Sequence, residues 1–594
     1  MWRILVFKCQ GVFIPIGGLR RLKEDCLFVF ERITGGVRST GVFYLCFTNI
    51  PSEISLRLLN RLALTDYSGL CLSERGVFML QIKSLTITHK KDLRTIVRDF
   101  NLVLNSGDKA VLIGEEGNGK STLLKWIFDP ALVENYVEAD GIRTSQGELV
   151  GYLPQELSEE DKKKTVYEFF SGLQAFQMAT AADLYKLSAE VGLSDTLFYS
   201  EQKMGSLSGG ERVKAQMAGI LLAHPDILLL DEPSNDIDLA TLRWLEKMIN
   251  SFTGGILFIS HDESLIERTA NRVVLIEQLR RKTISRVTVA NVPFSTFMKD
   301  RQRAFEKQEQ EAFSERREEK KAMERFQRIQ QSVEHDLRTI SRQNPSGGRL
   351  LKKKMKAVKS MERRYEREHK EMTEIPEAES AITIRFEQQK AIPAGKTIIE
   401  YELPELTSPE GKILAKDICL NVKGPEKICI IGDNGVGKTT LIRRIAALLL
   451  EREDITACYM SQNYEETLPF EMTPVEYLAP SEKKDDVTQV RTYLGSMKYT
   501  ADEMFHPIKE LSGGQKAKLL LLKMSLTEAN VLILDEPTRN FSPLSGPKVR
   551  GILKQFPGVI ISVSHDRKYI AEVCDKVYQM TSQGLSLLDK DNLV

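Results

Sequence analysis

The stretch GEEGNGKS, residues Gly114 to Ser121, decides the fold. It fits the pattern G-x-x-x-x-G-K-[ST] and lies between the apolar KAVLI and the helical TLLKWIF. Its glycines let successive backbone N–H groups turn toward phosphate oxygens, Lys120 adds a point charge, and Ser121 can hold Mg²⁺. A strand, this loop and a helix in that order predict a nucleotide-binding α/β domain.

A second copy of the loop shows that the sequence is duplicated. GDNGVGKT, residues Gly432 to Thr439, follows the apolar KICII and precedes the helical TLIRRIAALLL. LSGGE and LSGGQ, ILLLDEP and VLILDEP, and ISHD and VSHD repeat in the same order. Their members differ by 304 positions, as in Ser208 and Ser512, Glu232 and Glu536, and His261 and His565. A constant spacing over several motifs indicates an internal duplication.

The repeated motifs place acids, bases and phosphate donors at the ends of predicted strands. An apolar strand that ends in Asp-Glu brings two carboxylates to its carboxyl-terminal tip, where α/β sheets bind ligands. The first, Asp231 or Asp535, suits Mg²⁺, and the second suits orienting or deprotonating an attacking water. The histidine of SHD can hydrogen-bond a γ-phosphate or that water, and LSGG opens a helix that offers backbone donors to phosphate. The candidate catalytic residues are Glu232, His261, Glu536 and His565.

A glutamine also lies between each phosphate loop and its LSGG motif, at Gln155 and Gln462. With it, six elements occur twice in the same order, and the chain resembles the ATP-binding-cassette family across both halves. The resemblance implies ATP and Mg²⁺ as cofactors and hydrolysis of ATP to ADP and phosphate. In that family the LSGG signature acts on nucleotide held by the opposite half. Because both halves lie on one chain, the resemblance implies a monomer with an intramolecular ATP sandwich.

The resemblance also assigns a role to each motif residue. The residues expected to bind ATP are Gly114, Gly117, Gly119, Lys120, Ser121, Thr122, Gln155, Ser208, Gly209, Gly210, Gly432, Gly435, Gly437, Lys438, Thr439, Thr440, Gln462, Ser512, Gly513 and Gly514. The expected Mg²⁺ ligands are Ser121, Gln155, Asp231, Thr439, Gln462 and Asp535. The first phosphate loop is expected to face Ser512–Gly514, and the second to face Ser208–Gly210.

A charged helical insert separates the two halves. From Phe294 to Arg342 the sequence has no Pro or Gly, and one helix of that length would extend roughly 70 Å at ~1.5 Å per residue. QNPSGG, Gln343 to Gly348, is expected to break it, and a second helix is expected to run to Pro376. Apolar residues step by three or four along both segments, at Phe326, Ile329, Val333, Leu337 and Ile340, and at Leu351, Met355, Val358, Met361 and Tyr365. The pattern predicts a long antiparallel helical hairpin.

The tip of this hairpin is strongly basic. SRQNPSGGRLLKKKMKAVKSMERR, Ser341 to Arg364, carries nine basic residues and one acid, Glu362. A solvated spacer would explain the mixed-sign EKQEQEAFSERREEKKAMER but not the tip. A protruding run of Lys and Arg suits a dense phosphate surface. The candidate RNA-binding residues are Arg349, Lys352, Lys353, Lys354 and Lys356.

Duplicated cassettes, LSGG sequences and a charged hairpin linker together resemble the ABC-F family of ATPases that act on the ribosome. The resemblance covers Met79 to about Val594. It implies binding near the ribosomal E site in the ATP-closed state, with the hairpin directed at the P-site tRNA and the peptidyl transferase centre, and release on hydrolysis. The linker and the TRNFSP loop look most like the antibiotic-resistance branch, which displaces lincosamides, pleuromutilins and streptogramin A.

Three alternative functions stay open. A housekeeping translation factor of the same family would share every motif. An ATP-binding subunit of a transporter would need a membrane partner. A DNA-maintenance ATPase fits less well, because the linker is far shorter than the coiled coils of that class and lacks zinc cysteines.

The two halves differ in one functional loop and in one binding position. After DEP the first half reads SNDID and the second TRNFSP, so that Ser542 stands where the first half has Asp238. We expect both sites to bind ATP, and the loop leaves open whether they hydrolyse it at equal rates. His89 is a candidate adenine-stacking residue, with Thr407 as its rough counterpart.

Composition limits the class of protein. The net charge is +1, with 42% hydrophobic and 28% charged residues, which excludes a uniformly basic nucleic-acid coat but not a local basic patch. No apolar run approaches the ~20 residues that span a bilayer, and the first residues show no clear signal peptide. We therefore expect a cytoplasmic protein without a membrane segment.

Four domains are predicted: an N-terminal extension (1–78), a first ATPase domain (79–290), the hairpin (291–378) and a second ATPase domain (379–594). Four of the eight cysteines precede residue 79, in an aromatic-rich segment without clean periodicity. From Met79 onward the sequence alternates like paired strands. Met79 is therefore expected to be the true start, and a genuine N-terminal domain is the alternative.

Overall fold

The computed structural model describes residues 2–7, 27–34, 37–44, 80–145, 147–279, 284–339, 345–371, 386, 392–408, 411–479, 481 and 483–589. The chain divides into two compact units, Met1–Gly76 and Val77–Val594. In the first unit an antiparallel sheet has the order β1 (Trp2–Phe7), β2 (Leu27–Thr34), β3 (Val37–Tyr44). The predicted start, Met79, lies outside the described residues and stays a prediction. The bounds of the four predicted domains also stay predictions.

In the second unit, residues 80–290 (the first half) form two sheets. An antiparallel sheet has the order β5-β4-β7, and a six-stranded sheet has the order β12-β11-β6-β10-β9-β8. The strands are β4 (Leu80–His89), β5 (Thr95–Leu104), β6 (Lys109–Ile113), β7 (Val137–Ser145), β8 (Val150–Leu153), β9 (Ile227–Asp231), β10 (Gly255–Ile259), β11 (Arg272–Leu279) and β12 (Ile284–Ala290). The pairing of β4 with β5 confirms the predicted strand pair at the start of this half.

Residues 392–589 (the second half) repeat this architecture. A six-stranded sheet has the order β16-β17-β18-β15-β19-β20, which matches the first half strand for strand, beside the pair β13-β14. The strands are β13 (Thr397–Thr407), β14 (Ile413–Lys423), β15 (Lys427–Ile431), β16 (Ala457–Met460), β17 (Val531–Asp535), β18 (Val559–Val563), β19 (Lys576–Thr581) and β20 (Gly584–Leu588). In each sheet five strands are parallel and the last edge strand is antiparallel.

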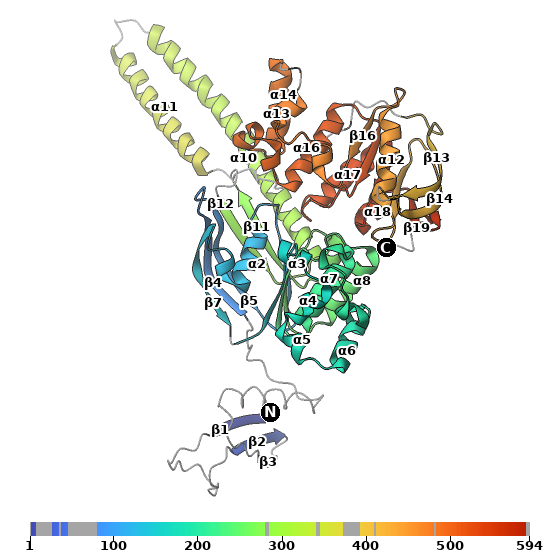
Figure 1. Cartoon of the computed structure of the whole chain (residues 1–594). Helices are drawn as coiled ribbons and strands as arrows, with labels where there is room; N and C mark the ends of the chain where they lie inside the picture. The colour runs from blue at the N-terminus through green and yellow to red at the C-terminus, as the bar shows by residue number, and fades with distance from the viewer. Residues whose placement is uncertain are drawn as a thin grey trace. The chain divides into compact units, whose positions relative to one another are not determined.

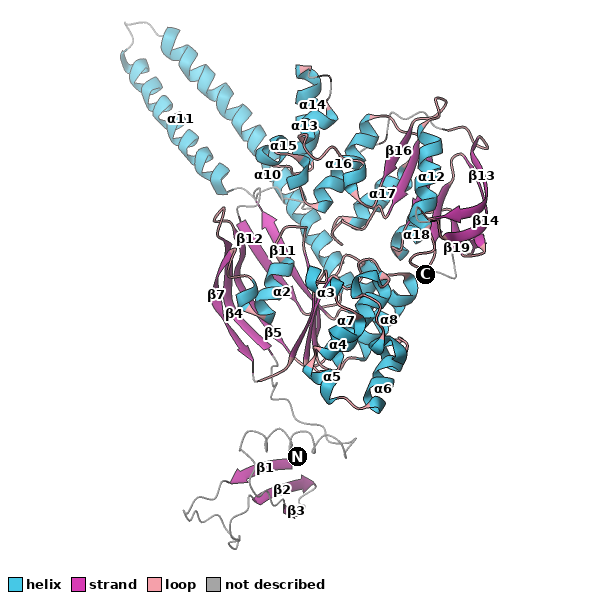
Figure 2. Ribbon diagram, in the orientation of Figure 1, coloured by secondary structure: helices cyan, strands magenta, loops and turns pink. Residues whose placement is uncertain are grey.

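Helices cover the strands of both halves (Figure 2). In the first half they are α2 (Lys120–Phe128), α3 (Glu159–Lys163), α4 (Val166–Ser171), α5 (Gln174–Met178), α6 (Ala181–Val191), α7 (Gly209–Leu221), α8 (Leu239–Ser251) and α9 (Glu263–Thr269). In the second half they are α12 (Lys438–Leu450), α13 (Pro474–Leu478), α14 (Lys484–Ser496), α15 (Ala501–Phe505), α16 (Gly513–Leu526), α17 (Gly546–Gln555) and α18 (Arg567–Val573). The predicted α/β fold of two tandem ATPase domains is confirmed.

The central strands are apolar throughout because helices cover both of their faces. In β9, Ile227 and Leu229 belong to the core that includes α2, whereas Leu228 and Leu230 belong to the core that includes α8. All five residues of β9 are buried. Parallel strands that are buried on both faces have this continuous apolar pattern. Among the described residues, no helix combines the length and the apolar character that a membrane crossing requires.

The insert between the halves forms two long helices that lie side by side, α10 (Phe294–Thr339) and α11 (Pro345–Glu371) (Figure 1). Phe326, Val333 and Val358 are buried between them, and the ring of Tyr365 meets that of Phe326 edge-on at 5.9 Å. Phe326, which precedes Val333 on α10, contacts Tyr365, which follows Val358 on α11, as expected for an antiparallel pair. Ile329 and Met361 are instead 45% and 38% exposed, so the predicted apolar seam is narrower than expected.

The predicted helix break over Gln343 to Gly348 is wrong for its last four residues. The helix α11 begins at Pro345 and includes Ser346, Gly347 and Gly348. Proline is tolerated in the first turn of a helix, where its missing N–H would have no partner. Residues 340–344, and with them Ile340 and Arg342, lie outside the described residues. So do residues 372–376, at the predicted end of the second helix.

The aromatic contact provides a test of the hairpin. Phe326→Ala removes a ring that is 5% exposed and should destabilise the pairing of the helices by about 3 kcal/mol, since truncating a buried Phe leaves a cavity. Hydrogen–deuterium exchange of peptides from α10 and α11 measures this as faster exchange in both helices. Ile329→Ala, at the half-exposed position one turn away, is the matched control and should change exchange little.

Candidate functional site

Each phosphate loop joins a central strand to a helix. The first follows β6 and starts α2 at Lys120; the second follows β15 and starts α12 at Lys438. Lys120 Nζ donates to the carbonyls of Gly114 and Glu115, at 3.0 and 3.1 Å, which holds the ammonium group across the mouth of the loop. Lys438 Nζ makes the equivalent bonds to its own loop at 2.7 and 2.9 Å.

The first glycine of each loop is required by geometry. Gly114 has φ +155° and Gly432 has φ +156°. A Cβ atom on Gly114 would approach the carbonyl oxygen of Ile276 to 2.4 Å, and one on Gly432 would approach that of Met580 to 2.5 Å. Only glycine fits at these two positions, because any side chain would collide with the neighbouring strand.

The predicted carboxylates lie at the carboxyl ends of β9 and β17. Asp231 accepts a hydrogen bond from Ser121 Oγ at 2.9 Å, so two of the three expected magnesium ligands of the first half are adjacent. Glu232 and Glu536 have left-handed backbone conformations, with φ +50° and +53°. Non-glycine residues adopt this conformation at a cost and mainly where the surrounding structure imposes it, often at functional sites.

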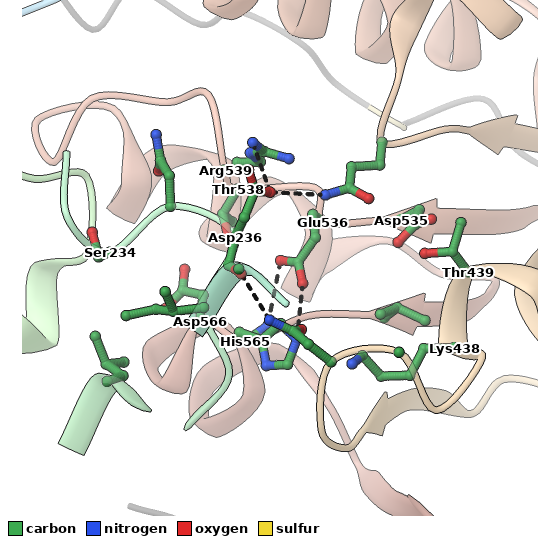
Figure 3. Close-up of a pocket in the computed structure, with 18 of the residues that line it drawn as sticks. Ser234, Asp236, Lys438, Thr439, Asp535, Glu536, Thr538, Arg539, His565 and Asp566 are labelled. Atoms are coloured by element: carbon green, nitrogen blue, oxygen red, sulfur yellow. Dashed lines mark hydrogen bonds and ion pairs between the residues drawn. The ribbon is translucent and has the colours of Figure 1, made fainter. Parts of the chain in front are cut away.

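The expected magnesium sites fit a divalent cation. Asp535 lies beside Thr439 (Figure 3), and neither of its buried carboxylate oxygens accepts a hydrogen bond among the described residues. A buried carboxylate without donors is stabilised by a cation. Burial raises the pKa of Asp231 and of Asp535 to about 6. When bound, Mg²⁺ would neutralise phosphate charge; Ser121, Asp231, Thr439 and Asp535 are placed to hold it.

The two candidate catalytic glutamates have different surroundings. Glu232 accepts a hydrogen bond from Gln155 Nε2 at 3.1 Å, and His261 Nε2 lies 3.2 Å from its Oε1. Glu536 receives the backbone N–H of His565 at 3.3 Å, but His565 Nε2 is 3.8 Å away. The first carboxylate thus has three side-chain partners, because Asn235 also donates to it. The second accepts from Ser564 Oγ at 3.4 Å and has a more distant histidine.

The different surroundings shift the pKa values of these side chains. Burial acts against ionisation of Glu232, but the hydrogen bond from His261 and the charge of Lys120 outweigh it and lower its pKa to about 2. Burial and the adjacent Asp535 raise the pKa of Glu536 to about 8. Burial and Lys438 lower the pKa of His565 to about 4. The carboxyl group of Glu232 is therefore ionised at neutral pH, whereas that of Glu536 would ionise fully only with a positive charge, such as that of Mg²⁺, bound beside it.

The signature of the second half contacts the first phosphate loop. The N–H of Gly514, in the first turn of α16, donates to Glu116 Oε2 at 2.7 Å. Lys518 Nζ, one turn further along, lies 3.3 Å from Glu115 Oε1. Ser512 caps this helix by accepting from the N–H of Gln515. A backbone donor that binds a carboxylate here can equally bind a phosphate oxygen.

The second phosphate loop and the first half enclose a cavity of about 440 Å³. Its lining includes Gly209, Asp236, Gly435, Gly437, Lys438, Thr439, Thr440, Gln462, Asp535, Glu536 and His565. Of the first signature, Gly209 lines the cavity and Ser208 caps α7. Both phosphate loops thus face the opposite half, as the family resemblance implies.

Asp236 is the main contact across this cavity (Figure 3). Its carbonyl accepts a hydrogen bond from Asn434 Nδ2 at 2.7 Å, and its carboxylate lies 2.9 Å from Arg539 and 3.5 Å from Gln462 Nε2. On the other side, His261 Nδ1 donates to the carbonyl of Phe541 at 2.9 Å. The SNDID and TRNFSP loops therefore both cross the interface between the halves.

The divergence of these loops changes the helix that follows. Asp238 caps α8 by accepting from the N–H of Thr241 at 2.8 Å. Ser542 does not take this role: its helix, α17, begins only at Gly546. The intervening Leu544 is 7% exposed and packs into a core of the first half.

The adenine-stacking candidate and the RNA-binding candidates lie outside the phosphate loops. His89 ends β4, and its Nδ1 pairs with Asp92 at 2.9 Å, while Thr407 ends β13 and accepts a hydrogen bond from Arg444. The adenine-stacking role of His89 stays a prediction. The five candidate RNA-binding residues are exposed on α11.

The sequence reading missed Glu115, Glu116, Asn434 and Lys518. The two glutamates and Asn434 occupy variable positions of the phosphate loops, and Lys518 lies one turn beyond the glycines of a signature. Charged or amide side chains at those positions, next to motifs expected to cross the interface, were the available signal.

Comparisons with known proteins agree with this geometry. The family described as "ABC transporter" matches residues 97–235 and 415–539, one match in each half. The chain is 25% identical to the putative ATP-binding protein YdiF of Bacillus subtilis, over 86% of this chain and 81% of that protein. It is 25% identical to ABC transporter F family member 5 of Arabidopsis thaliana (82% and 73% covered). It is 27% identical to the ATP-binding protein Uup of Haemophilus influenzae (80% and 74%).

Among solved structures, the archaeal ribosome recycling factor aABCE1, in complex with the ribosomal stalk protein aP1, superposes with a TM-score of 0.52. The match covers 85% of this chain and 89% of that chain at 16% identity. This likeness concerns the fold.

The catalytic roles can be tested by isosteric substitution. Glu232→Gln together with Glu536→Gln should slow ATP hydrolysis by about 10²–10³-fold, since each change removes a general base but keeps the side-chain shape. Phosphate release measures the loss, and a fluorescent ATP analogue measures binding, which should persist. Glu471→Gln, at an exposed residue that pairs with Lys509, is the control. Unchanged hydrolysis in the double variant would remove both glutamates from the catalytic step.

Proposed function

The chain is a tandem ATP-binding-cassette ATPase that resembles ABC-F proteins over most of its length, and on this premise we propose that it acts on the ribosome. In the proposed cycle, ATP closes the two cassettes, the closed form binds near the ribosomal E site, and the hairpin reaches toward the P-site tRNA and the peptidyl transferase centre. Hydrolysis then permits release. The protein would work in the cytoplasm as a monomer, because one chain supplies both parts of each nucleotide site.

The observation that carries the proposal is the basic face of α11. Arg349, Lys352, Lys353 and Lys356 are spaced by three or four residues, so they share one face of the helix. All four are exposed, and no acid occurs between Pro345 and Met361. Leu351, Met355 and Val358 lie on the opposite side, and Met355 and Val358 belong to the apolar contact with α10.

This division of the helix suits RNA. One face is occupied by the partner helix, and the other presents positive charge without neighbouring carboxylates to neutralise it. The N-terminus of α11 adds the positive end of a helix dipole at the same place. A surface of this kind binds phosphate backbones through the release of counterions. The archaeal protein of similar fold is named a ribosome recycling factor, which supports the proposal that this chain also acts on the ribosome.

The finer proposal is that the hairpin protects the ribosome from antibiotics at the peptidyl transferase centre. A housekeeping translation factor of the same family is the alternative. Translation in vitro with a lincosamide, with and without the protein, distinguishes them: restored synthesis supports protection, and no restoration supports the housekeeping role.

Sedimentation tests ribosome binding. The Glu232→Gln, Glu536→Gln protein should accumulate with ribosomes in a sucrose gradient when ATP is present, because a closed form that cannot hydrolyse ATP cannot be released. The association should disappear without ATP or at high salt. Absence from ribosomal fractions in ATP would contradict the proposal, and recovery in the membrane pellet would instead favour an ATP-binding subunit of a transporter.

The basic face has its own test. Alanine at Arg349, Lys352, Lys353 and Lys356 should weaken ribosome binding by at least tenfold and make its salt dependence shallower, since fewer counterions are released. ATP hydrolysis without ribosomes should not change.

Alanine at Lys299, Lys307, Lys320 and Lys321, four exposed lysines in the mixed-sign part of α10, is the matched control with the same loss of charge. Equal loss of binding in both variants would mean that net charge, and not the face of α11, determines affinity.

A further inference from the structure

Three pairs of equivalent positions in the two halves carry opposite charges. The spacing of 304 residues that relates the catalytic motifs also relates positions on α8 and α17 and on α9 and α18. The first half has Glu246, Glu263 and Arg268, and the second has Arg550, Arg567 and Glu572 at the same places. Every sign is reversed between the copies.

These residues contact one another across the interface. Arg550 donates two hydrogen bonds to Glu263, at 2.7 and 3.0 Å, and Arg567 pairs with Glu246. Because Glu246 is equivalent to Arg550 and Glu263 to Arg567, the two ion pairs are related by the duplication itself. They are the same contact, made twice with the halves exchanged.

The third position completes the set within each half. Arg550 Nε also donates to Glu572 at 2.9 Å, and Arg268 lies 3.7 Å from Glu246. Each central residue, Glu246 or Arg550, therefore has one partner across the interface and one in its own half. The same arrangement occurs in both halves with all charges inverted.

Burial makes these charges decisive. The side chains of Arg550, Glu263, Arg567 and Glu246 are 3%, 6%, 4% and 11% exposed. A buried charge that loses its partner is strongly unfavourable. If two first halves met through this face, Glu246 would oppose Glu263, and if two second halves met, Arg550 would oppose Arg567. Like charges placed against each other reject a wrong partner.

We propose that this reversed charge set is a pairing code between the cassettes. The acidic face of the first half fits the basic face of the second half and excludes another copy of itself. The pairing keeps these two faces in contact before nucleotide binds, and ATP then closes the two nucleotide sites. Covalent connection raises the effective concentration of the correct partner, so the code favours closure within one chain.

None of these charged residues belongs to a motif that is expected to contact nucleotide, although Glu263 and Arg567 follow the histidines of the two SHD motifs by two residues. The charged residues lie on α8, α9, α17 and α18, outside the phosphate loops, the signatures and the DEP carboxylates. Lys568 adds contacts to Glu267 at 2.6 Å and to Glu263 at 3.2 Å. Next to them, Leu544 packs into a core of the first half and Leu239 packs against a core of the second.

The test uses the full-length protein without nucleotide or ribosomes. Arg550→Glu with Arg567→Glu makes the interface acidic on both sides. A second variant exchanges all six charges: Glu246→Arg, Glu263→Arg, Arg268→Glu, Arg550→Glu, Arg567→Glu and Glu572→Arg. Hydrogen–deuterium exchange of peptides from α9 and α17 should be at least tenfold faster in the acidic variant and within about threefold of the native rate in the exchanged variant.

The control is Lys509→Glu, which replaces an exposed ion pair with Glu471 inside the second half by two acidic side chains. It should leave the exchange rates of both peptides unchanged. Native exchange rates in the acidic variant would overturn the proposal. So would an exchanged variant that melts cooperatively but keeps the fast exchange.

If the acidic variant has no cooperative thermal transition, neutral substitutions decide the matter. Glu263→Gln should lower the apparent Tm by about 5 °C, because it removes the carboxylate that Arg550 pairs with across the interface, and adding Arg550→Gln should recover part of that loss. Simple addition of the two decreases would mean that the residues do not act as a pair.

Discussion

Neither nucleotide site is complete within one half of the chain, and this constraint governs the rest of the structure. Each phosphate loop faces a helix or loop of the other half: Gly514 meets Glu116 on one side, and Asp236 meets Asn434 on the other. The halves must therefore be held face to face with their motifs in register. The shared sheet order, the crossing SNDID and TRNFSP loops and the ion pairs behind them all serve that alignment.

The duplication preserved the chemistry and changed what surrounds it. Both copies keep the loop lysine, the Asp-Glu pair and the histidine in equivalent places. Around them, His261 approaches its glutamate to 3.2 Å, whereas His565 stays at 3.8 Å. Despite burial, the hydrogen bond with His261 lowers the pKa of Glu232, whereas burial and the adjacent Asp535 raise the pKa of Glu536. Two sites with the same motif residues thus hold their glutamates in different protonation states at neutral pH.

The sequence was sufficient for the elements that short motifs define. These elements are the glycine loops, the apolar strands that end in Asp-Glu and the capped LSGG helices. They depend on local backbone geometry, which can be predicted from neighbouring residues. The hairpin boundary at Pro345 was misjudged, because proline and glycine break helices in their interior but are tolerated in a first turn. The partners of Glu116, Glu246 and Arg550 could not be read, since they lie hundreds of residues away.

The root of α10 has a mechanical consequence. Phe294 and Phe297 belong to a core of the first half, and Arg301 pairs with Glu277 of β11 at 2.6 Å. From this clamped base the helix continues for 46 residues, which at about 1.5 Å per residue makes a rod of roughly 70 Å. Such a rod is a lever arm: a rotation of the first half by about 5° would displace its far end by about 6 Å. A small rotation of the first half would therefore be amplified into a displacement of several ångströms at the basic tip.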